Sequence, residues 1–163
     1  MTDEGIVFRP IGIIHSGHED PAKTPVQPVY AKACSGIAEI FPEHADGLKD
    51  IEGFSHLYIL YHLHRSEPGK LIVKPFLQDR ERGVFATRSP ARPNAIGLSV
   101  VELVLRQNSI LHLRGVDILD GTPILDIKPY SARFDHIQAI RSGWLDEVDD
   151  DIAKLKGMRR YKS

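Results

Sequence analysis

Short apolar and β-branched runs, separated by polar and turn-forming segments, dominate the chain. Such runs are typical of half-buried strands. They occupy residues 8–15, 36–41, 55–63, 96–107, 110–116 and 124–127. In the fourth run Val101, Leu103 and Leu105 alternate with polar positions, and the turn residues Asn108 and Ser109 separate it from the fifth. The spacing predicts a β-hairpin whose first strand alternates regularly through Leu105.

Helical spacing is scarce. Residues 45–51 follow a proline and predict two helical turns, and residues 145–158 place Val148, Ile152 and Leu155 on one helical face. Residues 16–28 hold three prolines and predict a loop. Many strands with few helices predict a mainly β fold, either an antiparallel barrel or a sandwich.

Composition narrows the functional classes. With 163 residues the chain is expected to form one domain, and its 21 basic and 22 acidic residues exclude a global attraction to polyanions. Any contact with a nucleic acid must therefore come from a local patch. The single cysteine, Cys34, is expected to be a small buried hydrophobe, and the sequence shows no secretory leader and no apolar run of bilayer length. We expect a cytoplasmic protein without a membrane contact.

Residues 83–99 contain two arginines and two prolines between two apolar runs. Each proline favours an extended backbone in the residue before it, Ser89 or Arg92, so the segment predicts a stiff binding loop. Arginine offers a planar fork of donors that suits phosphate, carboxylate or a base edge. No Gly-x-Gly occurs anywhere in the chain, so a nucleotide-like ligand would not be held by the glycine-rich turn of a doubly wound fold.

A second informative segment covers residues 120–130. The Asp-Gly pair at its start predicts a tight turn that leaves backbone N–H groups free to hold a ligand. Alternation then puts Asp126, Lys128 and Tyr130 on one face. Such a face could steer protons, or it could be a surface ion pair beside a half-buried tyrosine.

The pair His62 and His64, with Glu67 close behind, suggests a metal-dependent small-barrel enzyme. The gap to Glu67 is shorter than such a motif requires, and no second histidine pair follows. We therefore expect no metal site and keep this reading as an alternative.

Several of these segments together are similar to one known family. They are GVFATRSP at 83–90, RPN at 92–94, IGLS at 96–99, DGTP at 120–123 and DIKPY at 126–130. On these motifs the chain resembles the TrmO (YaeB-like) family of tRNA adenosine N6-methyltransferases. The resemblance spans residues 8–130, and motifs of this length seldom recur by chance.

The resemblance implies a single-sheeted antiparallel β-barrel with few short helices and a C-terminal helical tail. It implies S-adenosylmethionine as cofactor, a homodimer, and methylation of N6 of threonylcarbamoyladenosine at position 37 of tRNA. The domain boundaries expected are 1–145 for the barrel and 146–163 for the tail. Carried over by position, the cofactor pocket comprises Gln27, Pro28, His64, Arg65, Arg88, Leu98, Asp120, Gly121, Thr122 and Pro123.

The acceptor side is our own hypothesis. Asp126, Lys128 and Tyr130 are expected to be catalytic, with a carboxylate or phenolate as base and Lys128 on an anionic group of the substrate. Arg92 and Asn94 are assigned to RNA contacts. A non-catalytic module that binds S-adenosylmethionine and RNA is the main alternative.

Overall fold

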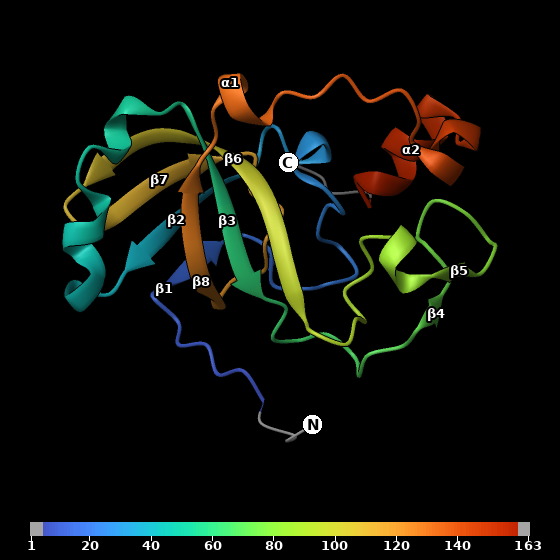
Figure 1. The fold of residues 1–163 in the computed structure, drawn as a ribbon, viewed down its shortest axis with the longest axis horizontal. Coiled ribbons are helices and arrows are strands. Elements are labelled where there is room, and N and C mark those ends of the chain that lie inside the picture. Colours follow the sequence, from blue (N-terminus) through green and yellow to red (C-terminus); the bar gives the residue numbers. More distant parts are fainter. Residues whose placement is uncertain (1–4, 160–163) are drawn as a thin grey trace.

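The computed structural model of the protein describes residues 5–159. Six antiparallel strands close into a barrel in the order β1-β2-β7-β6-β3-β8 (Figure 1), which confirms a barrel rather than a sandwich. The barrel strands are β1 (Gly12–Ser16), β2 (Ser35–Ile40), β3 (His56–His62), β6 (Ile96–Gln107), β7 (Ile110–Arg114) and β8 (Thr122–Pro129). The short strands β4 (Ile72–Val73) and β5 (Arg82–Gly83) form a separate hairpin.

Helices are short, as expected. The α-helices are α1 (Ala132–Asp135) and α2 (Asp150–Gly157), and the 3-10 helices are η1 (Pro28–Tyr30), η2 (Pro42–Leu48), η3 (Ile51–Gly53), η4 (Val84–Ala86) and η5 (Gly143–Glu147). Within residues 5–159 no helix has the length and apolarity needed to span a bilayer.

The core fills the barrel interior with alternate residues of the strands. Ile14, Leu57, Leu111 and Ile124 come from four different strands and have no exposed surface. Burial of each such side chain contributes roughly 1.5–3 kcal/mol to folding. Period-two alternation therefore correctly identifies the interior face over most of the sheet.

Two β-bulges reverse that alternation. In β6 the register shifts between Leu103 and Leu105, so Leu105 faces outward and is 43% exposed, and the unbroken alternation predicted through Leu105 was wrong there. In β8 the register against β3 shifts between Ile124 and Asp126. The extra residue, Leu125, turns the side chains that follow it to the opposite face of the sheet.

Three predicted boundaries were also wrong. Residues 8–11 are not part of a strand, since β1 begins at Gly12 and Pro10 lacks the N–H that a sheet ladder needs. Residues 45–51 form no α-helix, because the chain makes the 3-10 helices η2 and η3 with a left-handed Asp50 between them. The segment 145–158 breaks at Asp149, whose carboxylate caps α2. Residues 160–163 of the predicted tail lie outside the described residues.

Candidate cofactor site

Loops that are far apart in the sequence meet at one end of the barrel. The Arg88 guanidinium donates to Gln27 Oε1, joining the central loop, residues 84–95 between β5 and β6, to the residue that precedes Pro28 and η1. Thr122 Oγ1 at the start of β8 lies 3.4 Å from His64 Nδ1, just after β3. The structure thus brings together in pairs four of the residues that the family motifs predict for the cofactor.

Arg65, beside His64, donates to the Glu19 carbonyl oxygen at 2.6 Å and so reaches the loop that holds Gln27. Burial and the neighbouring His62 and Arg65 lower the pKa of His64, so its imidazole is neutral at pH 7. A neutral imidazole accepts or donates a hydrogen bond without adding a second positive charge beside Arg65. This end of the barrel therefore places arginine guanidinium groups next to neutral polar side chains.

The Asp-Gly turn is built differently from the prediction. The Asp120 N–H donates to His18 O and the Gly121 N–H donates to Ile14 O, each at 2.8 Å, so the expected free N–H groups are already bonded within the chain. Gly121 has a φ of +74°, which a side chain would strain. Asp120 Oδ1 accepts the Ser16 N–H at 3.0 Å. The turn offers a ligand the exposed carboxylate rather than main-chain donors.

A buried chain of hydrogen-bonded side chains, formed by Tyr61, Ser99 and Asp117, lies beneath these loops, and the sequence did not predict it. Ser99 Oγ donates to Asp117 Oδ1 at 2.6 Å, and the Tyr61 hydroxyl lies 3.1 Å from Ser99 Oγ. Because the single Ser99 proton is given to Asp117, Tyr61 must donate to Ser99. Burial raises the pKa of Asp117 to about 6, and the nearby Arg88 cation opposes that rise. The only sequence signal was a polar residue at an inward position of β6.

Gly97 leaves the space that the Tyr61 ring needs to join this hydrogen-bonded chain. It pairs with Tyr61 across β3 and β6, and a Cβ at Gly97 would overlap the Tyr61 ring, with Cδ2 at 2.8 Å. The glycine of the IGLS motif therefore gives the ring its space. Leu98, the next residue, points outward and is 54% exposed, as a ligand-contacting side chain requires.

Two residues assigned to RNA have different environments. Arg92 Nη1 donates to Thr87 O at 3.0 Å and to Ser89 O at 3.2 Å, so it braces its own loop. Asn94 is exposed. Internal bracing by Arg92 explains how the loop holds its shape, and only part of that guanidinium remains for a phosphate.

The predicted acceptor residues lie on the outer face of the barrel because of the Leu125 bulge. Lys128 Nζ lies 2.9 Å from Asp126 Oδ2, and the Tyr130 ring packs against Tyr58 with 5.7 Å between centroids. Leu60 of β3 pairs with Leu98 on one side and with Asp126 on the other. With strands about 4.8 Å apart, Asp126 lies about 10 Å from Leu98 across this row.

Tyr130 lies much farther from the loops. It is four residues beyond Asp126, about 13 Å along the strand direction, at the end of β3 that begins with His56. Within one chain Asp126 is therefore the member of the trio that adjoins the predicted cofactor residues.

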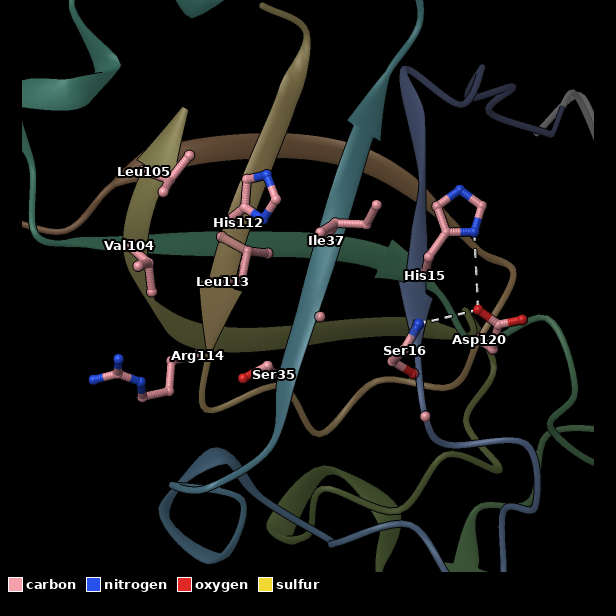
Figure 2. A pocket seen from close by; sticks show the side chains of 12 residues that line it. His15, Ser16, Ser35, Ile37, Val104, Leu105, His112, Leu113, Arg114 and Asp120 are labelled. Atoms are coloured by element: carbon pink, nitrogen blue, oxygen red, sulfur yellow. Dashed lines mark hydrogen bonds and ion pairs between the residues drawn. The ribbon is translucent and has the colours of Figure 1, made fainter. Parts of the chain in front are cut away.

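A shallow hollow of about 550 Å³ lies on the outer face of β1, β2, β7 and β6 (Figure 2). His15, Ile37, His112 and Leu105 form a cross-strand row along its floor. Among the predicted cofactor residues only Asp120 borders it. His15 is paired with Glu39 at 2.7 Å, and Figure 2 shows it near Asp120 at the rim. The hollow is thus adjacent to the loop cluster and separate from it.

The metal-site alternative finds no cluster to support it. Over the part of the chain that the structure describes, no group of three or more His, Cys, Asp or Glu side chains is placed to hold an ion. Cys34 is buried, as predicted, and burial raises the pKa of its thiol.

Comparison with known proteins decides the family. The model of the tRNA-methyltransferase O N-terminal domain matches residues 13–136, which includes every barrel strand except the first residue of β1. The chain belongs to the TrmO family. A crystal structure of TrmO from Pseudomonas aeruginosa superimposes with a TM-score of 0.71 at 37% identity, covering 86% of this chain and 62% of that one.

Other relatives of this TrmO-family chain carry two kinds of name. A probable S-adenosyl-L-methionine-binding protein of Pyrococcus abyssi is 51% identical over 97% of this chain and 86% of its own length. The human tRNA (adenine(37)-N6)-methyltransferase is 40% identical over 83% of this chain and 32% of its own length. The chain therefore spans about a third of the human protein and most of the archaeal one.

Proposed function

We propose that the protein transfers a methyl group from S-adenosylmethionine to N6 of adenosine at position 37 of tRNA, with threonylcarbamoyladenosine as the preferred form. The observation that carries the proposal is the meeting of Gln27 with Arg88 and of His64 with Thr122 at one end of a TrmO-type barrel. Enzymes named for this reaction are among its relatives.

The residues at this end fit the cofactor. S-adenosylmethionine carries a carboxylate, an ammonium and a sulfonium. Arg88 and Arg65 each supply a cationic fork for the carboxylate, and the Asp120 carboxylate suits the cationic groups. Exposed Leu98 offers an apolar surface for the adenine. This donor set matches all three charges, and Gln27 fixes the orientation of Arg88.

When bound, the cofactor supplies an electrophilic methyl carbon, to which the N6 lone pair forms a bond as the carbon–sulfur bond breaks. The protein contributes mainly by holding the acceptor in line, and such positioning lowers a barrier by several kcal/mol. The acceptor nitrogen must also lose its proton, because its lone pair is delocalised into the purine.

We propose that the Asp126 carboxylate is the base that accepts this proton. It lies in the same cross-strand row as Leu98, and its carboxylate is outward-facing and held by Lys128. Lys128 is then positioned for an anionic group of the substrate. Tyr130 and Tyr58 form a half-buried aromatic pair farther along the same face, suited to stacking with nucleobases. Asn94 and part of Arg92 are proposed to contact RNA.

The test is incubation with methyl-labelled S-adenosylmethionine and total tRNA, prepared with and without threonylcarbamoylation, followed by digestion to nucleosides. We expect label in N6-methylated threonylcarbamoyladenosine. Label on a different nucleoside would refute the proposal. Cofactor binding without any transfer would favour the second candidate, a binding module, which the names of the archaeal relatives support.

We also propose a homodimer. Residues 131–142, which include α1 and lead from the barrel toward α2 (Figure 1), contain Phe134, Ile137 and Ile140, which are 79%, 79% and 89% exposed. Monomeric proteins seldom leave so many large apolar side chains in one short segment uncovered, and a second copy would cover them.

Light scattering of the wild-type protein should give a dimer mass, and Ile140→Glu should shift it toward the monomer. Phe8→Glu, which changes an exposed residue elsewhere, is the control. A wild-type monomer at tens of micromolar would refute the proposal. The location proposed is the cytoplasm, where tRNA is available, and cell fractionation tests it.

A further inference from the structure

The C-terminal segment 143–159 contacts both loops that hold the Gln27–Arg88 pair. It lies after residue 136, where the family match ends, and includes η5 and α2. Figure 1 shows it beside the β4–β5 hairpin and the central loop rather than against the barrel wall. Its contacts fall into two groups, one at each end of the segment.

The first group joins η5 to the central loop. Trp144 Nε1 donates to the Ala86 carbonyl oxygen at 2.7 Å, two residues before Arg88. The Arg82 guanidinium lies over the Trp144 ring at 5.9 Å and its Nη2 is 3.7 Å from Glu147 Oε2. An indole, a cation and a carboxylate thus fix the start of the loop that carries Arg88.

The second group joins the end of α2 to the loop between β1 and β2, residues 17–34, which holds Gln27. The Val26 N–H donates to Gly157 O at 2.9 Å, and Val26 immediately precedes Gln27. The Tyr30 ring lies so close to Gly157 that a Cβ there would overlap it, with Cγ at 2.8 Å. Arg159 donates to Pro21 O and lies over the Phe76 ring at 4.4 Å.

We propose that segment 143–159 is part of the cofactor site, and that Trp144 and Gly157 are positioning residues that hold Arg88 and Gln27 side by side. The inference rests on the proposed function for the identity of the ligand. Arg88 is exposed and lies outside the barrel strands, so without the segment the Arg88–Gln27 pair would form only part of the time. Apparent affinity falls in proportion to the fraction of molecules in the competent state.

Two variants perturb the two ends independently. Trp144→Ala removes the hydrogen bond to Ala86 and the Arg82 contact, while Gly157→Ala pushes α2 off Tyr30. Trp144→Phe keeps a ring and loses only the N–H donor. Leu155→Ala is the matched control, since Leu155 lies in α2 and is 73% exposed.

Calorimetric titration with S-adenosylmethionine should show a Kd about tenfold weaker for Trp144→Ala and for Gly157→Ala, about the effect of a site competent a tenth of the time. Trp144→Phe should fall between them and the wild type, and the control should match the wild type. Trp144 is the only tryptophan in the chain, so cofactor binding should also change wild-type tryptophan fluorescence saturably with the same Kd.

Amide hydrogen exchange on the ligand-free protein separates this inference from the proposed function. In both positioning variants, exchange should speed up in residues 21–30 and 84–92 and stay unchanged in β3 and β7. Unchanged Kd and unchanged exchange in both variants would overturn the inference. If the wild-type protein bound no S-adenosylmethionine, the proposed function would fall, and the exchange data would still decide whether the segment holds the loops.

Discussion

Gly97→Ala should destabilise the protein through the Tyr61 ring. The new Cβ would overlap Cε2 and Cζ and lie 2.8 Å from Cδ2, and the ring is enclosed in the core. Overpacking of a core typically costs about 1–3 kcal/mol. Displacement of the ring also breaks the 3.1 Å contact with Ser99, worth about 1 kcal/mol. A lower backbone entropy of the unfolded chain returns roughly 0.5–1 kcal/mol, so the net loss should be about 1–3.5 kcal/mol, with a central value of about 2 kcal/mol.

Urea unfolding followed by circular dichroism measures this loss. With an m-value of about 2 kcal/mol/M, the central loss of about 2 kcal/mol should lower the midpoint by roughly 1 M. Gly47→Ala is the control, because nothing lies within 4 Å of a Cβ there and its φ is ordinary. It should change stability by no more than about 0.5 kcal/mol.

A double-mutant cycle with Tyr61→Ala tests the cause. Once the ring is gone, Gly97→Ala should cost less than about 0.5 kcal/mol, which leaves a coupling energy of about 2 kcal/mol between the two positions. The reasoning would be refuted if Gly97→Ala were as harmless as Gly47→Ala, or if its cost persisted in the Tyr61→Ala background.

Four further predictions concern charge and chemistry. Burial raises the pKa of Asp117 from 3.8 to about 6, so ionisation of this carboxyl disfavours the folded state. Between pH 4 and 6.5 the free energy of unfolding of the wild type, measured in urea, should therefore fall by up to about 3 kcal/mol relative to that of Asp117→Asn. The same pH dependence in both proteins would contradict this prediction. Asp126→Asn should lower turnover about 100-fold or more with an unchanged cofactor Kd, and full turnover would exclude it as the base. Arg88→Gln should weaken S-adenosylmethionine about tenfold or more by calorimetry, since a charge-assisted hydrogen bond is lost. Treatment with a chelator should leave transfer unchanged, whereas a stoichiometric transition metal in the purified protein would favour the enzyme built on His62 and His64.

The sequence predicted the barrel strands well because, outside the two bulges, their interior positions follow a period of two. Ile14, Leu57 and Ile124 stand where alternation expects them, and the hairpin at Asn108 has the turn chemistry that fixes its register. The failures were local. A left-handed Asp50 and an extended Asp149 interrupt segments whose apolar spacing alone is helical.

The bulges explain why side-chain direction was harder to predict than strand position. A single extra residue, Leu125, moves Asp126 and Lys128 from the core face to the outer face without changing the apolar pattern around them. Alternation correctly grouped the two residues, yet strict alternation from buried Thr122 and Ile124 would have placed them inside. Only the pairing with β3 reveals the shift.

The loop site depends on contacts that no local pattern encodes. Gln27 and Arg88 are 61 residues apart and His64 and Thr122 are 58 apart, so family motifs could name these residues but could not indicate which of them would be in contact. Asp117 illustrates the same limit, because its carboxylate gains a role only beneath Ser99 and Tyr61. Positions such as Trp144 and Gly157 lie beyond the matched motifs altogether.

The barrel and the loops of the proposed cofactor site are held in place by different contacts. The barrel supplies rigid ends for β3, β6 and β8, but Arg88 and Gln27 lie in loops that the barrel ladders do not hold. Contacts outside the barrel strands therefore help to set their geometry, and in this chain the contacts at Ala86 and Val26 both lead to residues 143–159. A barrel of this type that kept every motif and lost those two contacts would keep its stability and lose cofactor affinity, because the two properties are held by different parts of the chain.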